Sequence, residues 1–207
     1  MIFTGANLEF KSEGRVIFSL KDYRAAKGKH QLLLGPSGCG KTTLMNILAG
    51  LLRPGSGNIA FEGQDYSRLS DGALDHLRAR NFGFVFQKLH LIGHLTAAQN
   101  IAIAQEKSDP ERVHALIGDM GLSGKESRKA RDLSVGEAQR VAIARALANN
   151  PAVIFADEPT SALDDANTER VMNLLFEQAG KTGATLIVAT HDARIKGRFH
   201  DIVEMAA

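Results

Sequence analysis

The sequence predicts an α/β fold, in which a parallel β-sheet carries helices packed against it. Three short apolar runs, typical of strands buried on both faces, support this prediction: 30–34, 152–156 and 185–189. A helix expected over 165–179 separates the last two runs, and this order indicates parallel strands joined by right-handed crossovers. At 207 residues the chain is long enough for one well-buried domain.

The remaining elements divide the chain into a core and an insertion. Alternating or apolar segments predict four further strands, at 7–10, 15–20, 58–61 and 81–86. Helical spacing of leucines predicts a helix over 41–52, and a polar helix is expected over 70–80. From 89 to 149 the pattern becomes mostly helical, with helix-start signals at Thr96, Asp109 and Ser134. We expect a single domain over 1–207, with a core of 1–87 and 150–207 and a helical subdomain over 88–149.

A glycine-rich loop follows the first buried run and precedes the helix over 41–52. It fits the pattern G-x-x-x-x-G-K-[ST], whose backbone N–H groups curl around phosphates while a lysine and a hydroxyl contact the phosphates and Mg²⁺. The sequence therefore predicts a nucleoside triphosphate site. Its candidate residues are Gly35, Pro36, Ser37, Gly38, Cys39, Gly40, Lys41, Thr42 and the adjoining Thr43.

Two carboxylates follow the apolar run 152–156. Asp157 is expected at the carboxyl end of a buried strand, where it would face the phosphates and hold Mg²⁺ together with Thr42. Glu158 is placed to orient or polarise the attacking water. The alternative is a solvated acidic turn before Pro159, which the phosphate loop makes the weaker reading.

Composition excludes several classes of protein. A net charge of +2 is too small to argue for nucleic-acid binding, and we expect no nucleic-acid partner. The single cysteine, Cys39, rules out a disulfide within one chain and favours a reducing compartment. No apolar run approaches the roughly 20 residues that span a bilayer, so association with a membrane would require a partner.

The motifs and their order resemble those of ABC-type ATPases over essentially the whole chain. The matching segments are the loop 35–42, Gln87 after a strand, the segment 133–137 with its following helix, the pair 157–158, the segment 161–164 and His191. The resemblance implies a P-loop NTPase with a RecA-like parallel core, an N-terminal antiparallel β subdomain and an inserted α-helical subdomain. It also implies that ATP and Mg²⁺ are bound and that ATP is hydrolysed.

The family resemblance assigns further roles. Two such domains pair head-to-tail, so Ser134 and Gly136 would meet the γ-phosphate held by a second copy. Gln87 would sense Mg²⁺ and the attacking water, and His191 would contact the γ-phosphate. Asp164 would lie at the dimer contact. Phe10 is the candidate for stacking on adenine, with a role in the core as the alternative.

Two positions depart from the family's signature. Val135 stands where a glycine is usual, which places a branched side chain where the backbone could need an unusual conformation. Glu137 replaces glutamine and still caps the helix. Both bear on how tightly a closed dimer would grip ATP. Because Glu158 is retained, we expect active hydrolysis.

The segment 87–100 resembles the macrolide-export and lipoprotein-release branch of the family. This predicts the ATPase subunit of a membrane transporter or extraction complex, with a transmembrane permease subunit and a second ATPase copy as partners. It would lie peripherally at the cytoplasmic face of the cell membrane. The alternatives are an ABC-type ATPase that regulates a non-transport process such as cell division, a nucleic-acid-associated ATPase, and a small-molecule P-loop kinase.

Overall fold

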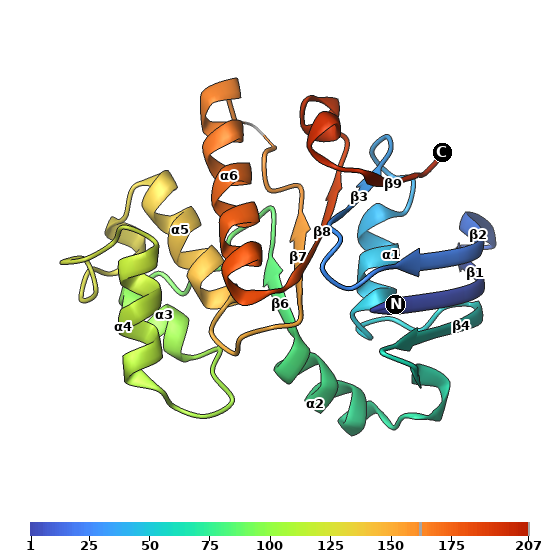
Figure 1. Cartoon of the computed structure of the whole chain (residues 1–207), viewed down its shortest axis with the longest axis horizontal. Helices are drawn as coiled ribbons and strands as arrows, with labels where there is room; N and C mark the ends of the chain where they lie inside the picture. The colour runs from blue at the N-terminus through green and yellow to red at the C-terminus, as the bar shows by residue number, and fades with distance from the viewer. Residues whose placement is uncertain (162, 207) are drawn as a thin grey trace.

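The computed structural model describes residues 1–161 and 163–206, and its central element is a five-stranded parallel sheet. The strand order is β6-β7-β8-β3-β9, and each neighbouring pair is parallel, as Figure 1 shows at the centre of the molecule. The bounds are β3 Gln31–Leu34, β6 Phe82–Val85, β7 Val153–Asp157, β8 Thr185–Thr190 and β9 Asp201–Glu204. The predicted parallel core is confirmed. Two residues lie outside the described part of the chain: Ala162, which belongs to the motif segment 161–164, and the terminal Ala207.

A second, antiparallel sheet forms the N-terminal part of the molecule (Figure 1). Its order is β2-β1-β4-β5, with β1 pairing β2 and β4 on its two edges. The strands are β1 Phe3–Ser12, β2 Arg15–Ala25, β4 Ser56–Phe61 and β5 Gln64–Asp65. β1 and β2 extend well beyond the predicted segments, because polar residues alternate with buried ones on a sheet that faces solvent on one side.

Six α-helices accompany the sheets in the described residues. Three belong to the core: α1 Lys41–Leu48, α2 Asp71–Asn81 and α6 Asp165–Thr182. The other three gather on one side of the sheet in Figure 1: α3 Ala97–Ala102, α4 Pro110–Asp119 and α5 Val135–Ala146. Short 3₁₀ turns complete the chain at Tyr66–Arg68, Ala130–Asp132 and Ala193–Arg198.

The predicted helix starts are confirmed by their caps. The Thr96 side chain accepts a hydrogen bond from the Gln99 N–H, and the Asp109 side chain accepts one from the Arg112 N–H. Two predicted extents were wrong. α1 stops at Leu48 rather than at position 52, since the amides of Leu51 and Leu52 both turn back to the Asn46 carbonyl, at 2.8 and 3.2 Å. Loops occupy much of 103–134, so the insertion is less helical than its sequence indicates.

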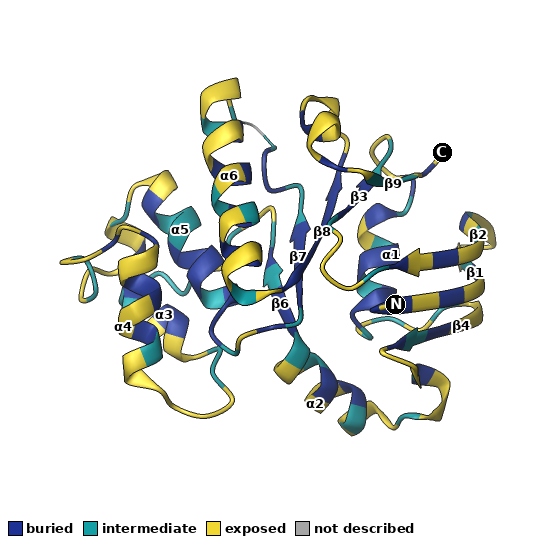
Figure 2. Cartoon of the chain, viewed as in Figure 1, coloured by how far each residue is buried: buried dark blue, intermediate teal, exposed yellow. Residues whose placement is uncertain are grey.

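The parallel sheet separates two hydrophobic clusters, and Figure 2 shows its strands buried. Alternate residues point to opposite faces, so Ile154 and Leu186 join one cluster while Phe155 and Ile187 join the other. The first cluster continues into α3, α4, α5 and α6, and the second into the antiparallel sheet, α1 and α2. The helical insertion thus shares its core with one face of the sheet.

A close approach of backbone joins α5 to β6. A Cβ atom at Gly83 would lie 2.0 Å from the Ala146 carbonyl oxygen, so the two elements can pack this closely only without a side chain there. Asn149, which follows α5, links this region to two further elements: its amide nitrogen donates to the carbonyl oxygens of Ala79 in α2 at 3.1 Å and of Ala104, just after α3, at 2.8 Å. Among residues 1–161 and 163–206, no helix combines the length and the apolar character needed to cross a bilayer.

Candidate nucleotide-binding site

The loop 35–42 connects the end of β3 to the first turn of α1, as its pattern predicts. Gly38 and Gly40 have φ values of 83° and 95°, in the left-handed region that favours glycine. Loops of this kind form an anion-binding concavity from their N–H groups, and the dipole of the following helix, here α1, adds to it. Pro36, Ser37 and Gly38 are exposed, and Cys39 is buried beneath them. The geometry suits an anionic group such as a phosphate chain.

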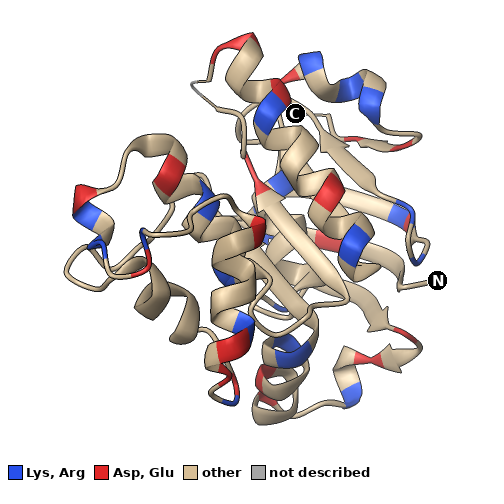
Figure 3. Ribbon diagram, turned by 60° about the vertical axis from the view of Figure 1, so that its left-hand side comes forward, with Lys and Arg blue, Asp and Glu red and all other residues tan. Residues whose placement is uncertain are grey.

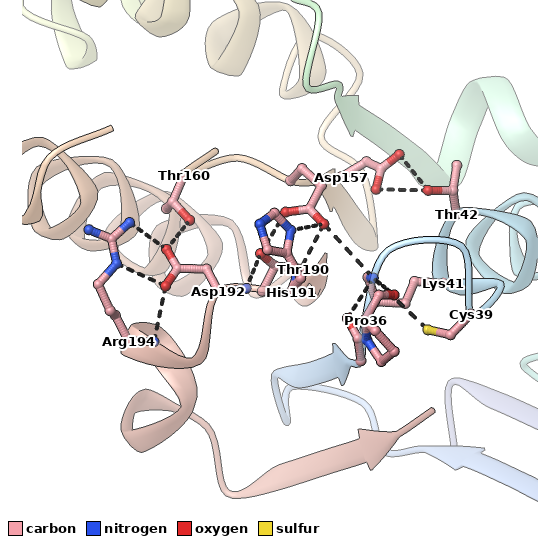
Figure 4. A network of polar contacts seen from close by, with 12 residues as sticks. Pro36, Cys39, Lys41, Thr42, Asp157, Thr160, Thr190, His191, Asp192 and Arg194 are labelled. Atoms are coloured by element: carbon pink, nitrogen blue, oxygen red, sulfur yellow. Dashed lines mark hydrogen bonds and ion pairs between the residues drawn. The ribbon is translucent and has the colours of Figure 1, made fainter. Parts of the chain in front are cut away.

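Lys41 lies inside this loop rather than on its surface. Only 5% of its side chain is exposed, and its ammonium donates to the carbonyl oxygens of Gly35 and Pro36, at 2.8 Å each (Figure 4). The Cys39 sulfur lies 4.0 Å from the same nitrogen. A buried ammonium whose short hydrogen bonds go to neutral carbonyls, with its nearest carboxylate, that of Glu158, at 3.9 Å, is a strong electrostatic partner for an incoming anion.

Asp157 ends β7 opposite the start of α1, as the sequence predicts. The Thr42 hydroxyl lies 3.1 and 3.0 Å from the two Asp157 carboxylate oxygens (Figure 4). Burial raises the pKa of Asp157, an effect opposed by the Thr42 hydrogen bond, and the neighbouring Glu158 raises it further. A desolvated carboxylate beside a hydroxyl is an oxygen-donor pair that a hard divalent cation would stabilise. Thr43, next along α1, is half-buried.

Glu158 and His191 come together at the same edge of the sheet. Glu158 has a φ of 48°, unusual for a residue with a side chain, and its N–H donates to the Ala189 carbonyl at 2.8 Å. Its carboxylate accepts from the Thr190 hydroxyl at 2.7 Å and from the His191 N–H at 3.1 Å. The His191 ring nitrogen Nδ1 is 2.8 Å from the carboxylate, and the Lys41 ammonium is 3.9 Å away.

The network continues into residues that the sequence did not single out. The Asp192 N–H donates to the Thr190 hydroxyl, and the Asp192 carboxylate accepts from Thr160 and Arg194 at 3.0 and 2.8 Å (Figure 4). The Arg194 hydrogen bonds are the main cause that lowers the pKa of Asp192 to about 2. Arg194 also bonds Asp165 at 2.5 Å, so it ties the segment after β8 to the start of α6. Thr190, Asp192 and Arg194 lie within three positions of His191 in the sequence, and this was the only signal for them.

Gln87 leaves β6 at the edge where Asp157 and Glu158 leave β7. The strands are parallel with Val85 opposite Ala156, so Gln87 emerges beside the carboxylates. Its side chain is exposed, and no hydrogen bond joins it to Asp157 or Glu158 in the described residues. The structure thus brings Gln87 to the same end of the sheet without direct contact.

Phe10 lies on β1, and one aromatic ring, that of Phe18, lies between it and the phosphate loop. Its ring stacks on Phe18 with a centroid separation of 6.5 Å. Phe18 in turn packs on Gly40, where an added Cβ would lie 2.8 Å from its ring. Phe10 is half-buried. Its position therefore fits both expectations: a ring available to a base bound at the loop, and a ring that packs against the core.

Ser134 and Gly136 are exposed at the N-terminus of α5. Ser134 and Glu137 form the predicted capping box, with the Ser134 N–H donating to Glu137 at 2.8 Å. Val135 is the first helical residue, has no positive φ and is 75% exposed, so the expected backbone difficulty at this position is absent. In the described residues no hydrogen bond joins Ser134 to the loop 35–42, so one chain does not bring them together.

Asp164 is exposed and caps α6. Its carboxylate accepts from the Asn167 N–H at 2.8 Å. Within one chain, Asp164 therefore acts as a helix cap. Its side chain is exposed to solvent, so the expected contact with a second copy stays a prediction.

Comparison with known proteins places this geometry in a family. Residues 21–161 match the family model described as ABC transporter. The chain is 42% identical to the lipoprotein-releasing system ATP-binding protein LolD of Aquifex aeolicus, over 86% of this chain and 82% of the relative. It is 39% identical to the macrolide export ATP-binding/permease protein MacB 1/2 of Paracoccus denitrificans, over 98% of this chain but only 31% of that relative.

Solved structures agree with the sequence comparison. A dimeric, post-hydrolysis ATP-binding cassette bound to ADP and Pi superposes with a TM-score of 0.85 and 31% identity, covering 98% of this chain and 94% of that one. A dimeric bacterial ABC transporter cassette gives a TM-score of 0.86 at 31% identity, with 99% and 94% covered. The motifs, the two-sheet fold and these relatives lead to one conclusion: the chain belongs to the ABC transporter family, as one of its ATP-binding, ATP-hydrolysing cassettes.

Proposed function

We propose that this chain hydrolyses ATP as one half of a head-to-tail homodimer and that this cycle powers a transmembrane partner. The observation that carries the proposal is the cluster of Lys41, Glu158 and His191 at one end of the sheet, while Ser134 and Gly136 are exposed elsewhere. A second copy would supply the exposed helix N-terminus to the γ-phosphate. The dimeric cassettes among its structural relatives support this arrangement.

The phosphate loop would bind the triphosphate through its N–H groups and Lys41. On binding, the Lys41 ammonium would exchange the Gly35 and Pro36 carbonyls for phosphate oxygens, which are stronger partners because they are charged. The ring of Phe10 would stack on adenine from the antiparallel sheet. The other candidate contacts of the loop are Ser37, Gly38, Cys39, Gly40 and Thr43.

The residues present fit a bound Mg²⁺. Mg²⁺ is usually held by one or two protein oxygens together with waters and substrate phosphates. Thr42 and Asp157 supply such oxygens, and no cluster of three or more His, Cys, Asp or Glu side chains that could hold a metal occurs over 1–161 and 163–206. When bound, Mg²⁺ would neutralise phosphate charge; Gln87 would lie beside it on the strand edge.

Glu158 would orient the attacking water and accept its proton. Thr190 and the His191 N–H fix the direction of this carboxylate, and its left-handed backbone turns it toward Lys41. The His191 ring is 57% exposed and contacts Glu158 through Nδ1, so its other nitrogen, Nε2, would meet the γ-phosphate as the cassettes close. Asp164, exposed at the start of α6, would contact the second copy.

Replacing Glu158 with Gln tests this role. Glu158→Gln keeps the shape of the side chain but removes the base, so steady-state ATP hydrolysis should fall by about 10²–10⁴-fold. ATP should then hold the protein as a dimer, measured by light scattering. A matched control is Glu169→Gln, at an exposed carboxylate on α6. Unchanged hydrolysis in Glu158→Gln would refute the assignment.

We further propose that 88–149 is a helical subdomain whose junction with the core receives the transmembrane partner. A cavity of about 330 Å³ lies there, and its lining includes Phe84 of β6, Phe86 just after this strand and Arg145 of α5. The Phe84 and Phe86 rings stack at 5.5 Å, and Arg145 fixes the loop after Gln87 by donating to the Leu89 and His90 carbonyls at 2.6 and 2.7 Å. An apolar hollow with an ordered rim suits a short helix of a partner.

The partner would hold the chain at the cytoplasmic face of the membrane. Figure 3 shows basic and acidic residues interspersed over the elements, which does not favour the nucleic-acid alternative. Glu158→Gln protein purified with ATP from native membranes should retain a transmembrane protein. Adding Phe86→Asp should release it, whereas Ile103→Asp, at an exposed apolar residue outside the cavity, should not.

Regulation of a non-transport membrane process is the second candidate. Vesicles reconstituted with the partner would separate the two, because only a transporter or extraction complex moves a substrate when ATP is hydrolysed.

A further inference from the structure

The first turn of α5, which is proposed to meet the phosphate, contains the carboxylate of Glu137. Glu137 follows Gly136 directly on α5, and its side chain is 10% exposed. An unpaired negative charge at this place would oppose the approach of a triphosphate. The structure shows how this charge is managed.

The Glu137 carboxylate is turned back and paired. One oxygen accepts the Ser134 N–H at 2.8 Å, and the other accepts a hydrogen bond from the Lys125 ammonium. Arg128 lies 3.9 Å from the first oxygen. The Lys125 bond is the largest cause that lowers the pKa of Glu137 to about 2, so the carboxylate is charged and held in place.

Lys125 is itself fixed, although it lies in the loop between α4 and α5. Its N–H donates to the Leu122 carbonyl at 3.0 Å, and its carbonyl accepts the Arg128 N–H at 3.0 Å. Its side chain is 37% exposed, so the ion pair is partly desolvated. A backbone turn therefore presents the ammonium to Glu137 from a segment outside α5.

We propose that Lys125 is a positioning residue for ATP-driven dimerisation: it neutralises Glu137 and holds that carboxylate against the Ser134 N–H, so that the start of α5 can accept the γ-phosphate of the opposite subunit. This inference rests on the proposed function. It explains how a cassette with glutamate at position 137 keeps its signature segment favourable to an anion. Lys125 acts through Glu137 and makes no contact with ATP in the proposal.

The test measures ATP-dependent dimerisation in the Glu158→Gln background by light scattering. Adding Lys125→Met should raise the ATP concentration for half-maximal dimer by about tenfold, because the Glu137 carboxylate then lacks its closest cation, keeps only the more distant Arg128, and repels the phosphate. Lys125→Arg should change it by less than about twofold. The same Lys125→Met change in a protein that also carries Glu137→Gln should have an effect below about twofold, since no charge is left to neutralise.

The controls separate the possible failures. Lys107→Met, at an exposed lysine of the same region, should leave dimerisation unchanged. Two results would overturn the inference. In one, Lys125→Met changes the ATP concentration for half-maximal dimer equally in proteins with Glu137 and with Glu137→Gln; in the other, it changes this concentration in neither. Lack of any ATP-dependent dimer in Glu158→Gln itself would instead contradict the proposed function. NMR titration of the monomer checks the pairing separately: the pKa of Glu137 should rise in Lys125→Met, and an unchanged pKa counts against the pairing.

Discussion

Replacing Asn100 with Ala should destabilise the start of the helical insertion. Asn100 is fully buried, and its side-chain amide organises the turn that precedes α3. Its oxygen accepts the Ile92 N–H at 2.8 Å, and its nitrogen donates to the carbonyl oxygens of Ile92 at 3.1 Å and Thr96 at 3.0 Å. A fourth, longer bond runs from the same nitrogen to the Leu95 carbonyl at 3.4 Å. Replacement with Ala removes all four bonds.

The cost follows from the groups left behind. Each lost bond to a half-buried backbone group costs about 1 kcal/mol, because water can partly replace the amide. The three shorter bonds therefore give a decrease of about 3 kcal/mol in the free energy of unfolding, and the long bond to Leu95 adds little. For a domain of this size, that corresponds to a fall in Tm of about 6–12 °C.

Urea unfolding with a fixed m-value and calorimetry measure this change, and hydrogen exchange reports the Ile92 amide directly. Asn173→Ala on the exposed side of α6 is the control: it removes only one exposed hydrogen bond, from Arg198 at 2.7 Å, and should stay within about 0.5 kcal/mol of the parent. A loss below about 1 kcal/mol in Asn100→Ala, with the Ile92 amide still protected, would refute the reasoning.

Three further outcomes are expected. Gly83→Ala should lower the free energy of unfolding by at least about 2 kcal/mol in urea, because its Cβ would overlap the Ala146 carbonyl, whereas Gly72→Ala has open space and should not destabilise. Phe10→Ala should raise the KM for ATP about fourfold if the ring stacks on adenine; unfolding free energy lowered at constant KM would indicate the core role instead. The Lys125–Glu137 pair should stabilise the fold above pH 4.5 and lose this contribution as the pH falls toward about 2, because folding lowers the pKa of Glu137. The free energy of unfolding measured against pH checks the sign, since Glu137→Gln should lack this loss.

Local signals predicted the parts of the fold that depend on neighbours in sequence. The capping box at Ser134, the start of α1 at Lys41 and the exit of β7 at Asp157 each follow from residues within a few positions. Contacts between segments far apart in the sequence were harder to predict. The bonds from Thr190 and His191 to Glu158 exist because β7 and β8 are neighbours in the sheet, and strand adjacency is not written in either segment alone.

β9 was not predicted, and the reason is physical. It has four residues, only two of them strongly apolar, and it forms the edge of the sheet, where half-exposed positions give no clear period. Its pairing with β3 is what supplies the hydrogen bonds that make it a strand. The extended network through Arg194 escaped prediction for a related reason: it joins Asp165 and Asp192 from two elements whose proximity depends on the sheet order.

The contact between Gly83 and Ala146 also has a mechanical consequence. α5 is 12 residues long, so Ser134 lies about 18 Å from the point where the helix meets β6. A rotation of about 10° at that point would move the helix start by roughly 3 Å, about the length of a hydrogen bond. Because no side chain separates Gly83 from Ala146, the two backbones can pivot closely against each other; in the proposed dimer, a small tilt at this contact would change the distance from Ser134 to a phosphate on the second copy.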